Sequence, residues 1–192
     1  MAYGKDASEL VVASNGSINV APVGSTLPTA VTASLAAAFV DLGYASEDGV
    51  TLNVAPEINE FGAWQSRQPV RRELAGQEVT LSFALEQWNA NTVKLSFGGG
   101  TITNPSGGTY RYELPEESAA LEEKALVVDW QDGPSRSFRL VCPRGNVTEG
   151  VETNLVRSGL ALLPITFKAL EQADGSTPAY ILSNDVAFGT GS

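Results

Sequence analysis

The chain has 192 residues, with 12 basic and 22 acidic side chains, no histidine and a single cysteine. These counts exclude a Ser-His-Asp triad, a Cys-His pair, a histidine metal site, an internal disulfide and a cage of thiolates around zinc or iron–sulfur. The net charge of −10 argues against binding DNA by neutralising its phosphates, while the apolar fraction of 43% allows a sizeable core.

The first 28 residues predict an extended arm. Ile18 and Val20 alternate with polar neighbours, and Pro22, Gly24 and Pro28 interrupt regular structure. The segment opens with charged residues and lacks the apolar stretch of a secretory signal, so we expect a soluble protein made in the cytoplasm. The long uncharged stretch that follows is rich in serine, glycine and proline, which argues against a membrane span.

A short helix is predicted over 29–42, ending at Gly43. Alanines favour a helix there, and the apolar residues fall on one helical face at spacings of four, four and three. These apolar residues are Val31, Leu35, Phe39 and Leu42. A second helix is predicted over 89–97, with Asn89 or Asn91 as its cap, and one or two helical turns are predicted over 115–124.

Strands dominate the remainder of the chain. The clearest is 77–87, where apolar and polar residues alternate, and the segment 160–170 is apolar at odd and even positions, so both of its faces are expected to be covered. Further strands are expected at 50–55, 61–65, 70–74, 101–103, 110–114, 125–130, 135–141 and 179–182. Many short strands and one or two small helices predict a mainly β fold of the sandwich or barrel type. We assign 29–192 to one such domain, preceded by the arm 1–28.

No residue is assigned to catalysis, to a cofactor or to a metal. Gly98-Gly99-Gly100 lacks the spacing and the lysine of a phosphate loop, and Glu47-Asp48-Gly49 lacks the remaining ligands of a calcium loop. The glutamate pairs at 116–117 and 122–123 suit a solvated surface better than a glycosidase site. Cys142 lies at strand spacing in an apolar segment, so we expect it in the core.

Two features point to a partner. Arg67, Arg71 and Arg72 form the only basic cluster of an acidic chain, and we interpret them as contacts to an acidic neighbouring subunit, with a nucleic-acid patch as the alternative. The tryptophans are expected to be core or interface anchors rather than ligand platforms, because an indole buries a large apolar area in either place. They are Trp64, Trp88 and Trp130.

An ordered set of segments resembles the major tail tube proteins of long-tailed, non-contractile bacteriophages, most of all those of phages that infect actinobacteria. The segments, in chain order, are 19–28 (NVAPVGSTLP), 42–51 (LGYASEDGVT), 63–65 (AWQ), 78–86 (EVTLSFALE) followed by Asn89, and 163–170 (LPITFKAL). No single segment is specific to the family, but their order and spacing extend over most of the chain. Ser66 stands where the usual motif has a glycine after Trp-Gln.

The resemblance implies a structural virion protein with a β-sandwich flanked by a helix, no enzymatic activity and no cofactor. Family members form rings of six subunits that stack into a hollow tail tube around a tape measure protein, bounded by tail-terminator and tail-tip proteins. DNA passes through the lumen without sequence-specific binding, and an acidic lumen would repel it. The protein is then expected in the phage tail, after synthesis in the cytoplasm of the host.

Subunit contacts are expected along the arm and over 44–72. The candidate interface residues are Val20, Pro22, Leu27, Tyr44, Trp64, Arg67, Arg71 and Arg72. If the arm gains order only on a neighbouring ring, deleting residues 1–28 would leave a folded domain that stacks poorly. Two alternatives stay open: a β-sandwich binding or adhesion module on a virion or cell surface, which would remain monomeric, and a carboxylate-dependent hydrolase.

Overall fold

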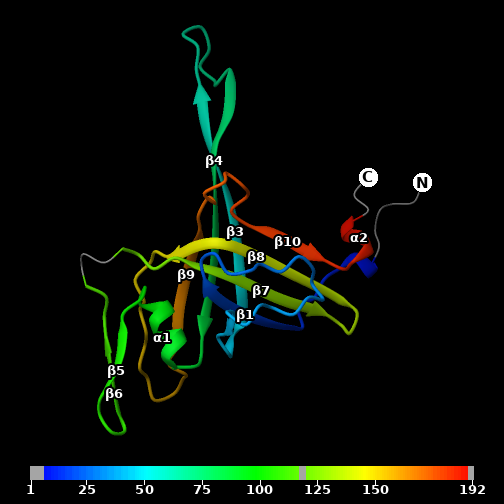
Figure 1. Ribbon diagram of the computed structural model, residues 1–192. Coiled ribbons are helices and arrows are strands. Elements are labelled where there is room, and N and C mark those ends of the chain that lie inside the picture. The colour runs from blue at the N-terminus through cyan, green and yellow to red at the C-terminus, as the bar shows by residue number, and fades with distance from the viewer. Residues whose placement is uncertain (1–6, 117–119, 190–192) are drawn as a thin grey trace. The chain divides into compact units, whose positions relative to one another are not determined.

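The computed structural model describes residues 7–116 and 120–189 (Figure 1). Within these residues the fold is mainly β, with antiparallel sheets and two short α-helices, which confirms the predicted fold class. The chain divides into two compact units. The first comprises the described residues of Met1–Tyr44, Glu123–Gly145 and Glu171–Ser192, and the second those of Ala45–Glu122 and Asn146–Leu170.

An antiparallel sheet forms the first unit, with its strands in the order β2-β1-β7-β8-β10. The strands are β1 (Asn15–Pro22), β2 (Val40–Asp41), β7 (Lys124–Asp132), β8 (Arg136–Val147) and β10 (Tyr180–Ser183). β1 lies between β2 and β7, and all eight of its residues are in register with β7. Its apolar side chains are buried together with those of β7 and β8, including Ile18, Val20, Leu126, Val127, Leu140 and Val141. The middle of the predicted arm is therefore a strand of this sheet.

Residues 29–42 do not form the predicted helix; they follow a series of turns and end in β2. The physical reason lies in Arg139, which is buried beside Asp129 and donates from Nη1 to the carbonyl oxygens of Ala30 and Ala33, both at 2.8 Å. A helix would need these carbonyls to accept from amides four residues further on. Charge-assisted bonds to the guanidinium hold the segment against the sheet in another conformation.

Arg136 ties both described ends of the first unit to the turn between β7 and β8. These ends carry a 3-10 helix, η1 (Ala7–Glu9), and the helix α2 (Val186–Gly189). Arg136 Nη1 donates to Asp132 Oδ2 and to Leu10 O, both at 3.0 Å, while Nε and Nη2 donate to Asp185 Oδ2 at 2.9 and 2.5 Å. The side chains of this cluster are mostly buried, so its ion pairs are screened less than pairs on the open surface.

Lowering the pH is expected to weaken the ion pair between Arg136 and Asp185. The hydrogen bonds from Arg136 hold the pKa of Asp185 below its ordinary value of 3.8. A carboxyl whose pKa is lowered by folding adds stability that is present above its unfolded pKa and is lost as the pH falls through its folded pKa. We therefore expect the Tm of the wild type to decrease as the pH is lowered below about 4. In Asp185→Asn, the Tm should depend less on pH in this acidic range. Calorimetry from pH 7 to acid tests this, with Asp48→Asn as an exposed control; parallel profiles for Asp185→Asn and wild type would contradict it.

The second unit contains an antiparallel sheet in the order β3-β4-β9, a separate two-stranded sheet of β5 and β6, and the helix α1. The elements are β3 (Ala45–Phe61), β4 (Arg71–Leu85), α1 (Ala90–Ser96), β5 (Thr101–Ser106), β6 (Thr109–Glu113) and β9 (Leu163–Ala169). Asn89 caps α1, as predicted: its side chain accepts from the backbone amides of Asn91 and Thr92. Thr92 Oγ1 accepts in return from Asn89 N at 2.9 Å, which completes a capping box.

Sequence patterns locate most strands of the chain, but the predictions for 61–65, 160–170 and 115–124 need correction. The alternation in 77–87 is confirmed by β4, whose buried side chains include Val79, Leu81, Phe83 and Leu85. β9 confirms a strand within 160–170, but its two faces are not both covered, because Pro164 is exposed and Thr166 and Lys168 are partly exposed. Leu160, which precedes the strand, is 66% exposed. The described residues of 115–124 are not helical, and the last of them begins β7; residues 117–119 lie outside the described residues.

Candidate subunit interface

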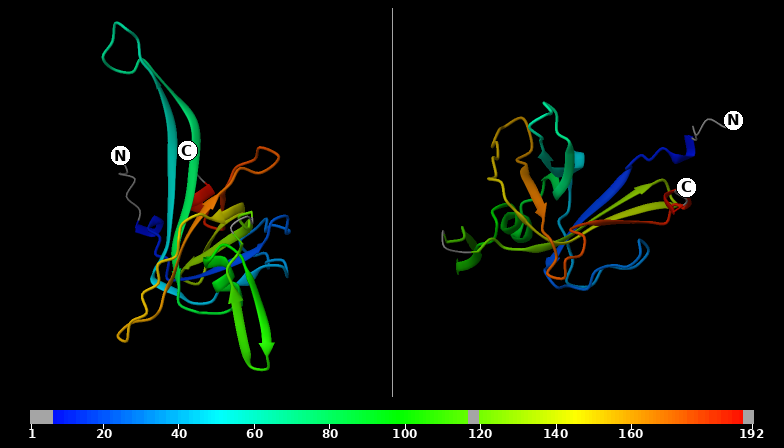
Figure 2. Two further views of the ribbon diagram at one scale, coloured as in Figure 1. Left: turned by 90° about the vertical axis from the view of Figure 1, so that its left-hand side faces the viewer. Right: turned by 90° about the horizontal axis from the view of Figure 1, so that it is seen from above.

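The most extended feature of the second unit is the hairpin of β3 and β4, seen from two further sides in Figure 2. β9 pairs with β4 only over 80–85, so the hairpin beyond that point, hereafter the outer hairpin (residues 54–79), is two-stranded in the described part of the chain. β3 is also an edge strand of 17 residues, and a long exposed edge favours pairing with another chain. The sequence predicted only short strands here, at 50–55, 61–65 and 70–74; the prediction at 61–65 is wrong, because β3 ends at Phe61 and the chain turns over 62–70.

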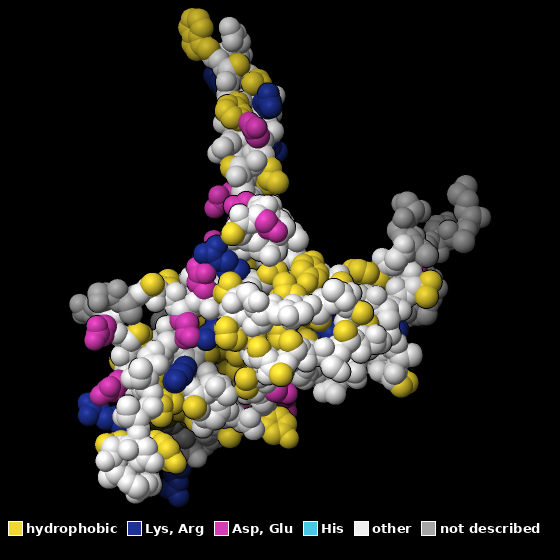
Figure 3. Space-filling view, in the orientation of Figure 1, with side chains coloured by type: hydrophobic (Ala, Val, Ile, Leu, Met, Phe, Trp, Pro, Cys, Tyr) yellow, Lys and Arg dark blue, Asp and Glu magenta, His cyan; other side chains and the backbone are white. Residues whose placement is uncertain are grey.

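Large apolar side chains of the outer hairpin face solvent, among charged ones (Figure 3). They are Val54, Ile58, Phe61, Trp64, Val70 and Leu74, with exposed fractions from 45% to 98%. A shift in register keeps Leu74 on the face of Val54 and Ile58: Glu57 is opposite Gly76, but Ile58 is opposite Leu74, which leaves Ala75 as the extra residue of a bulge. Because residues opposite each other share a face, the bulge puts Leu74 beside Ile58 in place of the smaller Ala75.

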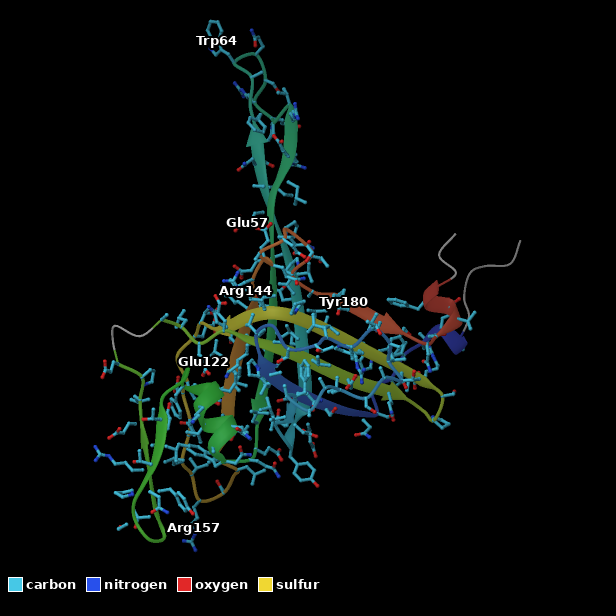
Figure 4. All side chains as sticks on the ribbon, in the orientation of Figure 1. Glu57, Trp64, Glu122, Arg144, Arg157 and Tyr180 are labelled. Atoms are coloured by element: carbon cyan, nitrogen blue, oxygen red, sulfur yellow. The ribbon has the colours of Figure 1, made fainter. Side chains whose placement is uncertain are left out.

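The loop at the end of the hairpin, hereafter the tip loop (residues 62–70), presents Trp64 to solvent (Figure 4). Trp64 is 98% exposed, which is unusual for the largest apolar side chain. Ser66 shapes the turn: its hydroxyl donates to Gln68 O at 2.9 Å and accepts from Gln68 N at 3.2 Å. The serine that departs from the usual motif therefore stabilises the tip loop through its side chain.

The predicted basic cluster lies in and beside the tip loop. Residues 61–72 include Arg67, Arg71 and Arg72 and no acidic residue. Arg72 Nε donates to Glu60 Oε1 at 2.8 Å, but both side chains are about half exposed or more, so this pair is worth at most about 1 kcal/mol. Arg67 and Arg71 form no ion pair within the described residues. The hairpin thus ends in a tryptophan surrounded by accessible positive charge.

The remaining predicted interface residues belong to the first unit. Val20 is only 8% exposed and lies in the core of the sheet, so its side chain offers no surface to a partner. Pro22 is exposed at the end of β1, Leu27 is half-buried, and Tyr44 is 73% exposed. Of the eight candidates, the structure brings four together on one hairpin and places one in the core.

The first unit also has a groove of about 560 Å³ next to Leu27, which sequence reasoning missed. Residues that line it include Val23, Leu27, Glu123, Pro143, Arg144 and Asp174. Arg144, labelled in Figure 4, donates from Nε and Nη2 to the two carboxylate oxygens of Glu123, both at 2.7 Å, and from Nη1 to Glu171 O at 3.4 Å. The bidentate pair lowers the pKa of Glu123 and raises that of Arg144, so both remain charged and fix the wall of the groove.

The other tryptophans are anchored within their own units. Trp88 is 49% exposed, and its Nε1 donates to Ala161 O at 2.7 Å. Trp130 is half-buried and stacks on Phe138 with ring centroids 5.4 Å apart. Trp64 differs from both, because it is nearly fully exposed and the structure gives it no polar or ring partner among the described residues.

The candidate chemical motifs have structural explanations. Cys142 is fully buried, and burial raises the pKa of its thiol to about 12, which confirms the predicted core residue. All three residues of Gly98-Gly99-Gly100 have positive φ, and a Cβ on Gly100 would lie 2.4 Å from Glu113 O, so this loop requires glycine. Within the described residues, no group of three or more His, Cys, Asp or Glu side chains could hold a metal ion. The helices of this part of the chain are too short and too polar to cross a membrane.

Comparison with known proteins agrees with the resemblance in the sequence. A family model described as phage tail tube protein matches residues 3–191. Among curated proteins, no match to the chain is found.

Proposed function

Because the chain belongs to the phage tail tube protein family, we propose that it is the major tail tube subunit of a long-tailed, non-contractile phage. The family consists of structural virion proteins rather than enzymes, and its members assemble with themselves into a tube. The ordered motifs from residue 19 to residue 170 support this assignment, and they also support an actinobacterial host.

The finer proposal concerns assembly. Six subunits close into a ring, the rings stack around a tape measure protein, and tail-terminator and tail-tip proteins bound the tube. DNA passes through the lumen into the host without sequence-specific binding. The chain's net charge of −10 supports such passage, because acidic side chains around a lumen would repel DNA and keep it from adhering.

The observation that carries the proposal is the outer hairpin. Six large apolar side chains face solvent on a two-stranded extension that has no core of its own. A two-stranded hairpin is marginally stable in water, and a large exposed apolar surface marks an interaction site. Burial against neighbouring subunits would stabilise the hairpin and cover the free edge of β3.

The proposed contacts use those candidate interface residues whose side chains are exposed. Trp64 supplies an aromatic anchor, and Arg67 and Arg71 supply exposed charges that form no ion pair with any described residue. Tyr44, 73% exposed, and Pro22 supply further contact area in the first unit. Val20 is excluded from the interface because it is buried in the subunit itself.

Electron microscopy of the purified full chain in a concentration series tests the proposed function. We expect rings or hollow tubes above a threshold concentration, since assembly follows mass action. The sample is also mixed with tail-tip extract from the same phage, which would supply an initiator of assembly. Monomers at every concentration, with and without that extract, would contradict the proposal and favour a monomeric binding module.

A further inference from the structure

We propose that the tip loop of one subunit docks into the groove of a second copy, with Trp64 inside the groove and Arg67 at its acidic edge. This inference rests on the proposed function, because it names the surface that receives the hairpin in the tube. It pairs an apolar side chain that is 98% exposed with a concave surface that the described residues of the first unit leave open.

The volume and the lining of the groove leave room for an indole. Its volume of about 560 Å³ lies within the range of roughly 300–1,000 Å³ that is typical of sites for small organic ligands. Val23, Leu27 and Pro143 give it apolar walls, and Val23 is 43% exposed although it is a large aliphatic side chain. A Trp side chain buries about 150–250 Å² when it is enclosed, so filling this groove would remove apolar surface from water on both partners.

The walls of the groove are already in place in the single subunit. Ser25 Oγ donates to Pro22 O at 2.7 Å, which fixes the turn on one side. Arg144 holds Glu123 and the carbonyl of Glu171 on the other. Docking therefore requires little ordering of the receiving surface, which lowers the entropic cost of association.

Charge complementarity favours the tip loop of a second copy as the segment that fills the groove. The tip loop contributes Arg67 and no acid, and Arg71 and Arg72 follow it directly, the latter paired with Glu60. The groove residues include Glu123 and Asp174, with Arg144 already paired to the glutamate. Asp174 is exposed, and hydrogen bonds from Ser176 lower the pKa of its carboxyl, so it remains ionised as an acceptor for Arg67.

The contact would be head-to-tail. Each copy carries one tip and one groove, and these are different surfaces, so every subunit donates to one neighbour and receives from another. Such a heterologous interface closes into a ring or continues as a stack, depending on the rotation between copies. In a tube made of rings, this contact could join neighbours within one ring or subunits of two stacked rings.

Cysteine cross-linking between two variants of the full chain tests the inference. Gln65→Cys puts a thiol beside Trp64, and Ala173→Cys puts one in the groove; both positions are exposed. The native Cys142 is buried with its pKa raised to about 12, so it does not react with a maleimide in the folded protein. The two variants are purified separately, assembled together, treated with a short bismaleimide, dissolved in denaturant and analysed by gel and peptide mass spectrometry.

We expect a covalent dimer that joins position 65 of one copy to position 173 of another. Its yield should exceed by several-fold the yield obtained when the groove variant is replaced by Thr103→Cys on β5 or Val186→Cys on α2, which are both exposed. If either variant of the pair fails to assemble, Gly62→Cys and Thr26→Cys repeat the test from neighbouring positions of the tip and the groove edge.

Failure of the inference and failure of the proposed function give different results. If wild-type protein forms tubes but the thiol at position 65 of the variant joins a control position as efficiently as position 173, the groove assignment is overturned and the tube function stands. Wild-type protein that forms neither rings nor tubes, with or without tail-tip extract, overturns both. A charge exchange adds a second readout: Arg67→Glu or Asp174→Lys alone should lower the cross-linking yield, and the two together should restore it.

Discussion

Trp64→Ala is expected to raise the subunit concentration at which tubes form by about 30-fold or more. Truncating a central aromatic anchor of an interface costs about 2–4 kcal/mol of binding free energy, and about 1.4 kcal/mol corresponds to a tenfold change. The Tm of the unassembled subunit should not change, because Trp64 is 98% exposed and its removal leaves no cavity. Sedimentation over a concentration series measures the first quantity, and calorimetry below the assembly threshold measures the second.

Two variants serve as controls for this prediction. Trp88→Ala removes a tryptophan that donates to Ala161 O, so it should lower the Tm of the subunit. Trp64→Phe retains an aromatic ring and should raise the assembly threshold less than the alanine variant does. An unchanged threshold in Trp64→Ala, or a lowered Tm without any effect on assembly, would show that this side chain serves the subunit alone.

From the sequence alone, Trp64 could be assigned to the core or to an interface, but the two could not be told apart. A large aromatic residue next to arginines has the composition of an interface anchor, but the same residue in an alternating apolar segment also suits a core. The choice depends on whether a third strand covers the hairpin at this point. That depends on β9, which pairs only with residues 80–85 of β4 and is more than ninety residues away from Trp64 in the chain.

Local signals predicted the elements that depend on near neighbours. Alternation located β4, and Asn89 located the start of α1. Each of these signals acts through contacts within a few residues. The length of the outer hairpin was missed, since the sequence predicted separate short strands at 50–55, 61–65 and 70–74; Pro56 lies on an edge strand and Gly76 next to a bulge, where both are tolerated.

Elements that depend on distant partners could not be predicted. The period in 29–42 fits a helix, but Arg139, over one hundred residues later, binds the carbonyls of Ala30 and Ala33. The groove is likewise assembled from segments near residues 25, 123, 144 and 173, and only the first of them, within the motif 19–28, carried a signal in the sequence. The sequence therefore indicated the tip of the proposed interface and, through Leu27, one residue of the proposed receiving surface, but it did not indicate the groove itself.

Deleting residues 1–28 is expected to abolish cooperative unfolding, and not merely to impair stacking. The deletion removes β1, whose residues Ile18, Val20 and Ala21 are buried, and leaves the backbone of β7 unpaired along one side. Loss of a buried large aliphatic side chain costs about 2–5 kcal/mol. Losing two such side chains together with eight paired backbone positions therefore costs an amount comparable to the whole free energy of unfolding of a typical domain, about 5–15 kcal/mol. Circular dichroism melting and gel filtration test this.

A deletion of residues 1–13 is the matched comparison, since it keeps β1 and its pairing with β7. It removes the carbonyl of Leu10 that accepts from Arg136, but Asp132 and Asp185 still bind that guanidinium, so the subunit should remain folded with a slightly lower Tm. Any loss of assembly in this shorter deletion is then due to contacts between subunits, which is the role first expected of the whole arm. A sharp thermal transition in the protein lacking residues 1–28 would mean that β7 and β8 fold without β1, and the longer arm would again be the candidate contact.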